Sequence, residues 1–293
     1  MRTFSSRTYE PESPLVRTQH LEIGEFHASP LSRDFETIAS PFDRPHFVFP
    51  SSPVVIELDT GRHFVADRGC AVMYPANLPY RRYALSDRGD HCMWIAPTRS
   101  LLSSETQFGD ICRRLAQREI EPFRVRIPND LFLEQRTLLY ALINGNTVYD
   151  LDSRLLRICG SLARQKRLEP HEITLANRIE EMLAEKYEKK TTLMDVAQTL
   201  DVTCEHICRL YRKSFATTIH QHVIQLRTRD ALERILEGES SLMKIAIELG
   251  FNSHTHFTAT MRTAFGRSPS QIRSDRSFAA QSQRPGEQRC GRP

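Results

Sequence analysis

The chain has 293 residues, of which 40% are hydrophobic and 26% are charged, and its formal net charge is +4. This is the balance of an ordinary globular protein, and the mild positive charge permits a polyanionic partner without requiring one. No run of about 18 apolar residues occurs, so no membrane span is expected, and the polar residues 1–10 form no secretory signal. The seven cysteines are scattered and odd in number, which predicts reduced cytosolic thiols and excludes a disulfide framework.

The first 40 or so residues are polar with isolated prolines, and we expect them to begin in a loose form on the surface. Six short segments rich in β-branched and aromatic residues follow, separated by turns that contain Gly, Pro or Asp. They are 46–49, 54–58, 62–66, 70–74, 80–85 and 92–96. Short strands at near-regular spacing predict an antiparallel β-barrel or sandwich, and the interior of a small barrel has room for one small ligand.

Near residue 100 the pattern becomes helical, with spaced leucines and isoleucines that indicate core or dimer-interface positions. The helices expected here are 101–117, 129–143 and 151–165. A charged stretch that ends in Pro170 then predicts an interdomain linker, and the remainder is helical. We therefore expect an α+β protein with a first domain at 1–165, a linker at 166–172, an all-α domain at 173–275 and a disordered tail at 276–293.

The stretch 192–270 repeats itself. Leu193 returns as Leu242, an offset of 242 − 193 = 49, and after one extra residue Ile207 returns as Phe257, an offset of 257 − 207 = 50. Each copy predicts a short helix, a tight turn and a second helix with one buried face. A single pattern of this kind is often only two packed helices, but two in tandem are much more specific for helix-turn-helix units.

Local signals mark several helix ends in this region. Thr192 stands three residues before Asp195, which is a capping-box pattern. A long helix over 219–237 is expected between the copies and ends before a glycine. Ser268 and Pro269 predict the start of a last short helix, with the serine as cap and the proline in the first turn.

Four sequence motifs in residues 173–275 closely resemble those of the DNA-binding domain of the AraC/XylS family of bacterial transcription regulators. They are Asp195-Val-Ala197, His206-Ile-Cys-Arg209-Leu-Tyr211-Arg-Lys213, Ile245-Ala-Ile-Glu-Leu-Gly250-Phe251 and Ala264-Phe265-Gly266-Arg-Ser268-Pro269. The resemblance covers about the last third of the chain. It implies a cytoplasmic transcription regulator whose partner is double-stranded DNA, with two recognition helices in successive major-groove segments about one DNA turn apart.

Residue roles follow from this resemblance. Base-facing positions are expected at Glu205, Cys208 and Arg209 in the first copy and at His254, Thr255, His256 and Ala259 in the second. Arg209 is the strongest candidate, because arginine can pair with guanine O6 and N7 at once. Contacts to phosphates are expected from Arg212, Lys213, Arg262 and Arg267.

Three positions depart from the family pattern. Ala259 stands where an arginine is frequent, Met261 where an aromatic is frequent, and Ala216 where glycine is usual. The second copy is therefore expected to read sequence weakly or mainly to hold the DNA backbone. Residues 173–275 hold 14 Lys and Arg against 13 Asp and Glu, a balance of 14 − 13 = +1, so the DNA prediction depends on the motif and not on bulk charge.

The front half resembles, more loosely, the cupin-like sensor domains that accompany this DNA-binding module. The resemblance implies a small-molecule effector of unknown identity, a homodimer and, as in the family, contact with RNA polymerase. Candidate pocket residues are Phe47, Tyr74, Tyr80 and Trp94, although core packing is the commoner role of such side chains. A bound ligand is expected to shift the helices at 101–165 relative to the linker. The effector, the operator and the choice between activation and repression stay open.

Catalytic and metal sites are not expected. Cys204 and Cys208 share a helix face but lack a second ligand pair, and His46, His63 and His91 lack the histidine-x-histidine pair of a cupin metal centre. The expected protein is therefore not an enzyme and holds no cofactor. Two alternatives remain: a cupin oxygenase or isomerase with a helical appendage, and a scaffold that binds RNA polymerase without reading DNA.

Overall fold

The computed structural model describes residues 14–32, 35, 43–168, 174–189, 192–239 and 241–281, with backbone alone from residue 276. Packing divides the chain into two compact units. Met1–Pro128 and Asp150–Arg227 form the β-sheet unit, and Asn129–Tyr149 and Thr228–Pro293 form the helical unit. Each unit is described by itself below.

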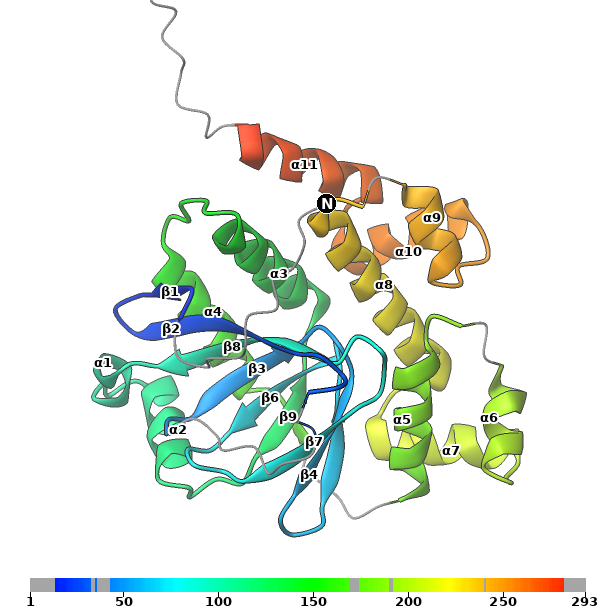
Figure 1. The fold of residues 1–293 in the computed structure, drawn as a ribbon, viewed down its shortest axis with the longest axis horizontal. Coiled ribbons are helices and arrows are strands. Elements are labelled where there is room, and N and C mark those ends of the chain that lie inside the picture. Colours follow the sequence, from blue (N-terminus) through cyan, green and yellow to red (C-terminus); the bar gives the residue numbers. More distant parts are fainter. Residues whose placement is uncertain are drawn as a thin grey trace, which may run out of the picture. The chain divides into compact units, whose positions relative to one another are not determined.

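The strands of the β-sheet unit form two antiparallel sheets (Figure 1). One has the strand order β1-β2-β8-β3-β6-β9-β10 and the other has the order β5-β4-β7. The strands are β1 (Val16–Arg17), β2 (Leu21–Ala28), β3 (His46–Pro50), β4 (Val54–Leu58), β5 (His63–Ala66), β6 (Cys70–Tyr74), β7 (Tyr80–Ala84), β8 (Asp90–Pro97), β9 (Phe123–Arg126) and β10 (Arg167–Leu168). The predicted antiparallel β domain is confirmed, and the six predicted strands are β3 to β8.

Strand β2 corrects the expectation of a loose amino-terminal segment. It pairs with the whole of β8, from Leu21 opposite Pro97 to Ala28 opposite Asp90. The sequence did not predict this strand, because it contains acidic residues such as Glu22 that are usually found on the surface. Its side chain is only 4% exposed and pairs with Arg17 at 2.6 Å.

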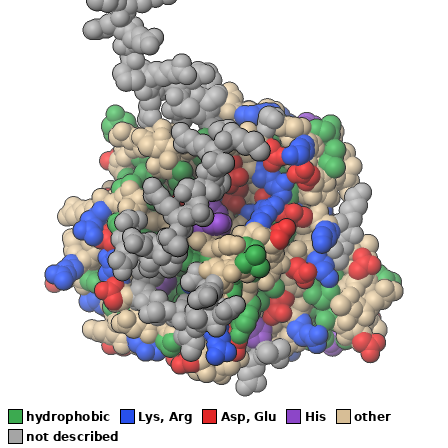
Figure 2. Space-filling view, in the orientation of Figure 1, with side chains coloured by type: hydrophobic (Ala, Val, Ile, Leu, Met, Phe, Trp, Pro, Cys, Tyr) green, Lys and Arg blue, Asp and Glu red, His purple; other side chains and the backbone are tan. Residues whose placement is uncertain are grey.

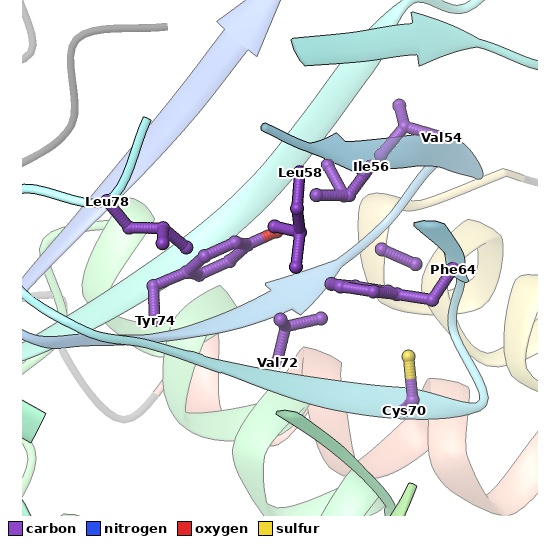
Figure 3. Packing of buried hydrophobic residues seen from close by; sticks show 9 residues of the cluster. Val54, Ile56, Leu58, Phe64, Cys70, Val72, Tyr74 and Leu78 are labelled. Carbon is purple, nitrogen blue, oxygen red and sulfur yellow. The ribbon is translucent and has the colours of Figure 1, made fainter. Parts of the chain in front are cut away.

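The core of this unit lies between the two sheets. Val54, Ile56 and Leu58 on β4 are buried against Val72 and Tyr74 on β6 (Figure 3). Alternate residues of a strand point to opposite faces, which is why the spacing of two along β4 produces one apolar inner face.

Helices complete the β-sheet unit. They are α1 (Arg99–Leu102), α2 (Gln107–Ala116), α4 (Leu151–Ala163), α5 (Leu175–Lys186), α6 (Leu193–Thr199), α7 (Cys204–Phe215) and the first part of α8 (Ile219–Glu237). The single helix expected over 101–117 is thus two helices, because Thr106 caps a new one and accepts a hydrogen bond from the Gly109 amide at 3.0 Å. Residues 169–172 of the predicted linker lie outside the described residues.

The helical unit contains α3 (Asn129–Ile143), α8 from residue 228 onward, α9 (Leu242–Glu248), α10 (His254–Phe265) and α11 (Pro269–Gln281). The predicted all-α region with a long connecting helix is confirmed, and the bounds of α3 and α8 are those expected. Helix α11 continues past residue 275, where the tail was expected to begin, and residues 282–293 lie outside the described part. Within that part, no helix is long and apolar enough to cross a membrane.

Candidate nucleic-acid interface

The repeat forms two helix-turn-helix motifs: α6 with α7, and α9 with α10. Hydroxyl side chains start both second helices, since Thr203 Oγ1 accepts from the His206 amide at 3.2 Å and Ser253 Oγ from the His256 amide at 3.0 Å. The predicted capping box is present at the start of α6. These caps satisfy amides that a helix start leaves unpaired, so each recognition helix begins at a defined residue.

The residues with left-handed backbone correspond between the two motifs. Asp201 (φ 54°) corresponds to Gly250 (φ 69°) at an offset of 250 − 201 = 49, and Ala216 (φ 53°) to Gly266 (φ 70°) at 266 − 216 = 50. The left-handed region costs a residue with a side chain about 1–2 kcal/mol. Ala216 is therefore a strained end to α7, at the position where the sequence already departs from the family pattern.

The buried faces of the recognition helices are those that the spacing predicted. Helix α7 buries Ile207, Tyr211 and Phe215, while α10 buries Phe257, Met261 and Phe265. The opposite faces are left to solvent.

The exposed face of α7 carries the residues expected to read bases. Glu205 and Arg209 have side chains 87% and 71% exposed, and Arg209 Nη1 lies 3.9 Å from Glu205 Oε1. Cys208, Arg212 and Lys213 are exposed on the same helix. A long, exposed guanidinium on a helix that buries only its other face can enter a major groove.

Helix α10 presents a less charged face. His254, Thr255, Ala259 and Arg262 are exposed. His256 is half-buried, and its ring centroid lies 5.7 Å from that of Phe251. Its base-facing role was expected from the resemblance, but this packing turns part of the ring toward the protein.

The sequence did not predict a DNA-facing position for two residues that are exposed on the recognition helices. His206 on α7 is exposed and occupies the place of His256, since 256 − 206 = 50. Thr263 on α10 is exposed and corresponds to Lys213, since 263 − 213 = 50. The repeat offset, applied to every position, is the signal that would have found both.

The predicted phosphate contact at Arg267 has an internal partner. Arg267 Nη1 lies 2.5 Å from Asp275 Oδ2, and both side chains are more than half exposed. Positive and negative side chains are interspersed over the face of the molecule in Figure 2. The candidate interface is therefore marked by the geometry of the recognition helices.

Three buried polar pairs join β9 and the β5–β6 turn to α5 and α8, the helices that flank the first helix-turn-helix motif. We call them the polar docking contact: Arg124–Glu180, Asp67–His222 and Arg68–Tyr187. Arg124 Nη1 and Nη2 donate to the two Glu180 carboxylate oxygens at 2.9 and 2.8 Å. His222 Nε2 lies 3.1 Å from Asp67 Oδ2, and Arg68 Nη1 donates to Tyr187 Oη at 2.6 Å.

Electrostatics keep Asp67 and Arg124 charged despite their burial. Burial alone raises the pKa of Asp67, but the hydrogen bond and charge of His222 outweigh it and lower the pKa to about 2. Burial lowers the pKa of Arg124, but the Glu180 carboxylate outweighs it and the net pKa is raised. The helices that flank the first helix-turn-helix motif, α5 and α8, are thus attached to the sheet region through compensated buried charges.

A cavity lies between the sheets, and Tyr74, Tyr80 and Trp94 line it as the sequence predicted, together with His46 and Arg82. Its volume is ≈ 40 Å³, which is room for about three water molecules. Burial, and secondarily the nearby arginines, lower the pKa of His46 to about 4. A larger ligand does not fit inside without rearrangement.

Phe47 is not part of this cavity, contrary to the expectation. Its neighbours His46 and Val48 line the cavity, and side chains alternate along a strand. Phe47 therefore points to the other face of β3, where its ring lies 5.4 Å from Phe108 on α2. Among the described residues no cluster of three or more His, Cys, Asp or Glu could hold a metal ion.

A helix-turn-helix domain family matches residues 196–275. The Msm operon regulatory protein of Streptococcus mutans is 22% identical over 99 residues, which are 34% of this chain and 36% of that protein. The melibiose operon regulatory protein of Escherichia coli K12 is 22% identical over 219 residues, 72% of this chain and 69% of that protein. The match thus spans about a third of the length of the first relative and about two thirds of the second.

Among solved structures, ToxT from Vibrio cholerae O395 aligns over 88% of this chain and 98% of its own, at 12% identity and a TM-score of 0.35. The tandem motifs and the matched family define residues 196–275 as a helix-turn-helix domain of the kind found in DNA-binding transcription regulators. This segment is similar to the helix-turn-helix domains of AraC-type regulators.

Proposed function

We propose that this regulator acts at bacterial promoters by reading bases with α7 and holding the DNA with α10. The observation that carries the proposal is the exposed face of α7, where Arg209 is 71% exposed on a helix whose other face is buried. In this role Arg209 pairs with guanine, and Glu205 accepts a hydrogen bond from a cytosine amino group. Cys208 faces the bases beside them.

The second recognition helix makes a weaker contribution to sequence choice. His254 offers a ring, Thr255 a hydroxyl and a methyl group, and Ala259 a methyl group. The ring of His256 packs on Phe251 and is only partly available to DNA. Arg262, Arg212 and Lys213 contact phosphates, which fix register without specifying sequence. Arg267 joins them once its pair with Asp275 opens.

The β-sheet domain, proposed at residues 1–165, serves as the effector-sensing and dimerisation domain for the DNA-binding domain at 173–275. Support for coupling comes from the polar docking contact, which ties β9 and the β5–β6 turn to α5 and α8. A ligand alters DNA binding only by its different affinity for two arrangements of these parts. The protein acts in the cytoplasm, as a homodimer, with RNA polymerase as a further partner and without a catalytic role.

Selection of randomised duplex DNA by the purified full chain tests the DNA proposal. An enriched motif about two DNA turns long is expected. Arg209→Ala should relax one position of that motif, and Arg262→Ala should weaken binding evenly across sequences and reduce the salt slope by about one. If no sequence is enriched and binding disappears with salt, the chain does not read DNA by sequence.

A further inference from the structure

Three buried side chains from three elements of the β-sheet unit form a hydrogen-bonded chain. Tyr211 lies on α7, His222 on α8 and Asp67 in the turn between β5 and β6. Tyr211 Oη is in hydrogen-bond contact with His222 Nδ1, and His222 Nε2 lies 3.1 Å from Asp67 Oδ2. The Gly69 amide donates to the other carboxylate oxygen, Asp67 Oδ1, at 2.6 Å. Every polar atom of the three side chains therefore has a partner.

The ionisation of the end groups sets the direction of the hydrogen bonds. Because the pKa of Asp67 is lowered to about 2, this side chain is a carboxylate without a hydrogen, and His222 Nε2 must be the donor. Burial, and then the charge of Glu180, raise the pKa of Tyr211 well above its usual value, so its hydroxyl keeps its hydrogen. A buried polar network whose members are all satisfied holds its parts in one arrangement.

The second helix-turn-helix motif has apolar residues at the corresponding positions. The repeat offset of 50 takes Tyr211 to Met261 (261 − 211) and His222 to Ile272 (272 − 222). Met261 and Ile272 are both buried, so a recognition helix can pack on the helix that follows it through apolar side chains alone. The polar pair of the first motif is therefore not a requirement of the helix-turn-helix fold. It stands where the β5–β6 turn supplies a carboxylate.

The sheet region also contacts the carboxyl-terminal end of α7. Arg126 Nη2 on β9 donates to the Phe215 carbonyl at 3.3 Å, and a cation is favourable at this end of a helix. The opposite face of α7 stays open, since Glu205 and Arg209 have side chains 87% and 71% exposed. The sheet region thus holds the recognition helix from its buried side and leaves the face proposed to read bases free.

We propose that Asp67 and His222 are positioning residues for DNA reading, which hold Tyr211, and with it the recognition helix α7, in one orientation on the sheet region. The inference rests on the proposed function of α7. Arg209 lies two residues before Tyr211 on the same helix, so the chain also sets the place of its guanidinium. A binding element that is held in its bound orientation loses less freedom on binding and binds more tightly.

The direction of regulation follows from this geometry. The arrangement in which α7 is docked on the sheet region is the one that reads DNA, because the docking contacts fix the helix without covering its exposed face. An effector that binds this arrangement better than the undocked one strengthens DNA binding by the ratio of its two affinities.

The test measures the affinity of the full chain for duplex DNA that carries the motif enriched by the same chain. Tyr211→Phe removes one hydroxyl and keeps the ring, and it should raise the Kd about fivefold or more. The loss should fall on the motif positions that Arg209→Ala relaxes. Tyr187→Phe is the matched control, since its buried hydroxyl bonds Arg68 and Glu188 outside the chain, and it should leave the Kd unchanged.

A conservative variant separates positioning from a general loss of packing. His222→Gln should keep the affinity, because a glutamine amide has both a donor and an acceptor, whereas His222→Leu should lose it. Asp67→Ala and Tyr211→Phe interrupt the same chain, so their effects on the binding free energy should not add in the double variant. Equal losses in the two His222 variants, additive effects in the double variant, or an equal loss in Tyr187→Phe would each overturn the proposal.

Hydrogen exchange on the free protein distinguishes this inference from the regulator function. Tyr211→Met combined with His222→Ile copies the pair of the second motif, which keeps the packing of the first motif and removes the link to Asp67. Amides of residues 204–215 should then exchange faster than in the original protein, and unchanged exchange would overturn the inference. If the original chain enriches no DNA motif, the regulator function fails, and the exchange result still decides whether the chain of hydrogen bonds holds α7. Equal DNA affinity of the original chain and this double variant would remove the positioning role alone.

Discussion

Arg124 on β9 and Glu180 on α5 face each other in a two-pronged ion pair in which both side chains are only 3% exposed. Arg124 Nη1 also donates to the Val65 carbonyl at 2.5 Å, and the guanidinium lies 5.7 Å from the centre of the Phe215 ring at the end of α7. One arginine of the sheet therefore contacts both the lead helix and the recognition helix of the first motif.

Removing one member of this pair should be costly. Arg124→Met leaves the Glu180 carboxylate buried without its partner, and we expect a loss of about 3–5 kcal/mol in the free energy of unfolding. Arg124→Met combined with Glu180→Met should recover most of it, since apolar pairs often replace buried ion pairs without penalty. Urea unfolding at pH 7 measures both.

The pair Arg88–Glu188 is the control, because it joins the same parts of the β-sheet unit at 2.7 Å with side chains 39% and 35% exposed. Arg88→Met should cost less than about 1 kcal/mol. Equal losses for Arg88→Met and Arg124→Met would contradict a special role of the buried pair.

Ala216→Gly should stabilise the protein by about 1 kcal/mol, because Ala216 adopts φ 53° and glycine removes the clash of a side chain in the left-handed region. Gly266 occupies the same place in the second motif with φ 70°. Ala259→Gly is the matched control within a helix and should destabilise by about 1 kcal/mol. Thermal unfolding measures whether each variant is more or less stable than the original protein. A loss of stability in Ala216→Gly would show that the backbone at Ala216 is not strained.

Ala259→Arg should add a base contact to the second recognition helix. Ala259 is exposed and corresponds to Arg209 in the repeat, so an arginine there should create a preference for guanine of about 1–3 kcal/mol at one position. Thr263→Arg, which corresponds to Lys213, should instead strengthen binding to all sequences. Selected motifs that stay unchanged with Ala259→Arg would show that α10 does not approach base edges.

Stability should fall in mild acid because of His46. Its pKa is lowered from 6.5 to about 4, first by burial and then by Arg82 and Arg44, so the folded state binds this proton less well than the unfolded state. The stabilisation of the folded state by the neutral His46 ring is complete above pH 6.5. It is lost as the pH falls through about 4, which lowers the free energy of unfolding by up to about 3 kcal/mol. His46→Gln should flatten the unfolding free energy between these pH values; an unchanged slope would assign the acid sensitivity elsewhere.

Local patterns determined much of this protein. The repeat determined both helix-turn-helix motifs and their buried faces at Ile207, Tyr211 and Phe215, because a helix that packs on one side must repeat every three to four residues. Short-range chemistry likewise determined the capping box at Thr192 and the strands β3 to β8. Each of these signals lies within a few residues of the structure that it specifies.

Only the tertiary structure decided where buried charges find their partners. Glu22, Arg124 and Glu180 look like surface residues in the sequence, and their burial depends on partners from distant parts of the chain. The sequence also left open on which side of β3 the Phe47 side chain lies. Alternation along a strand predicts two faces, but it does not predict which face lines the cavity. The contact of His63 Nε2 with Glu181 Oε1 joins residues 118 positions apart (181 − 63), and no local pattern predicts such a contact.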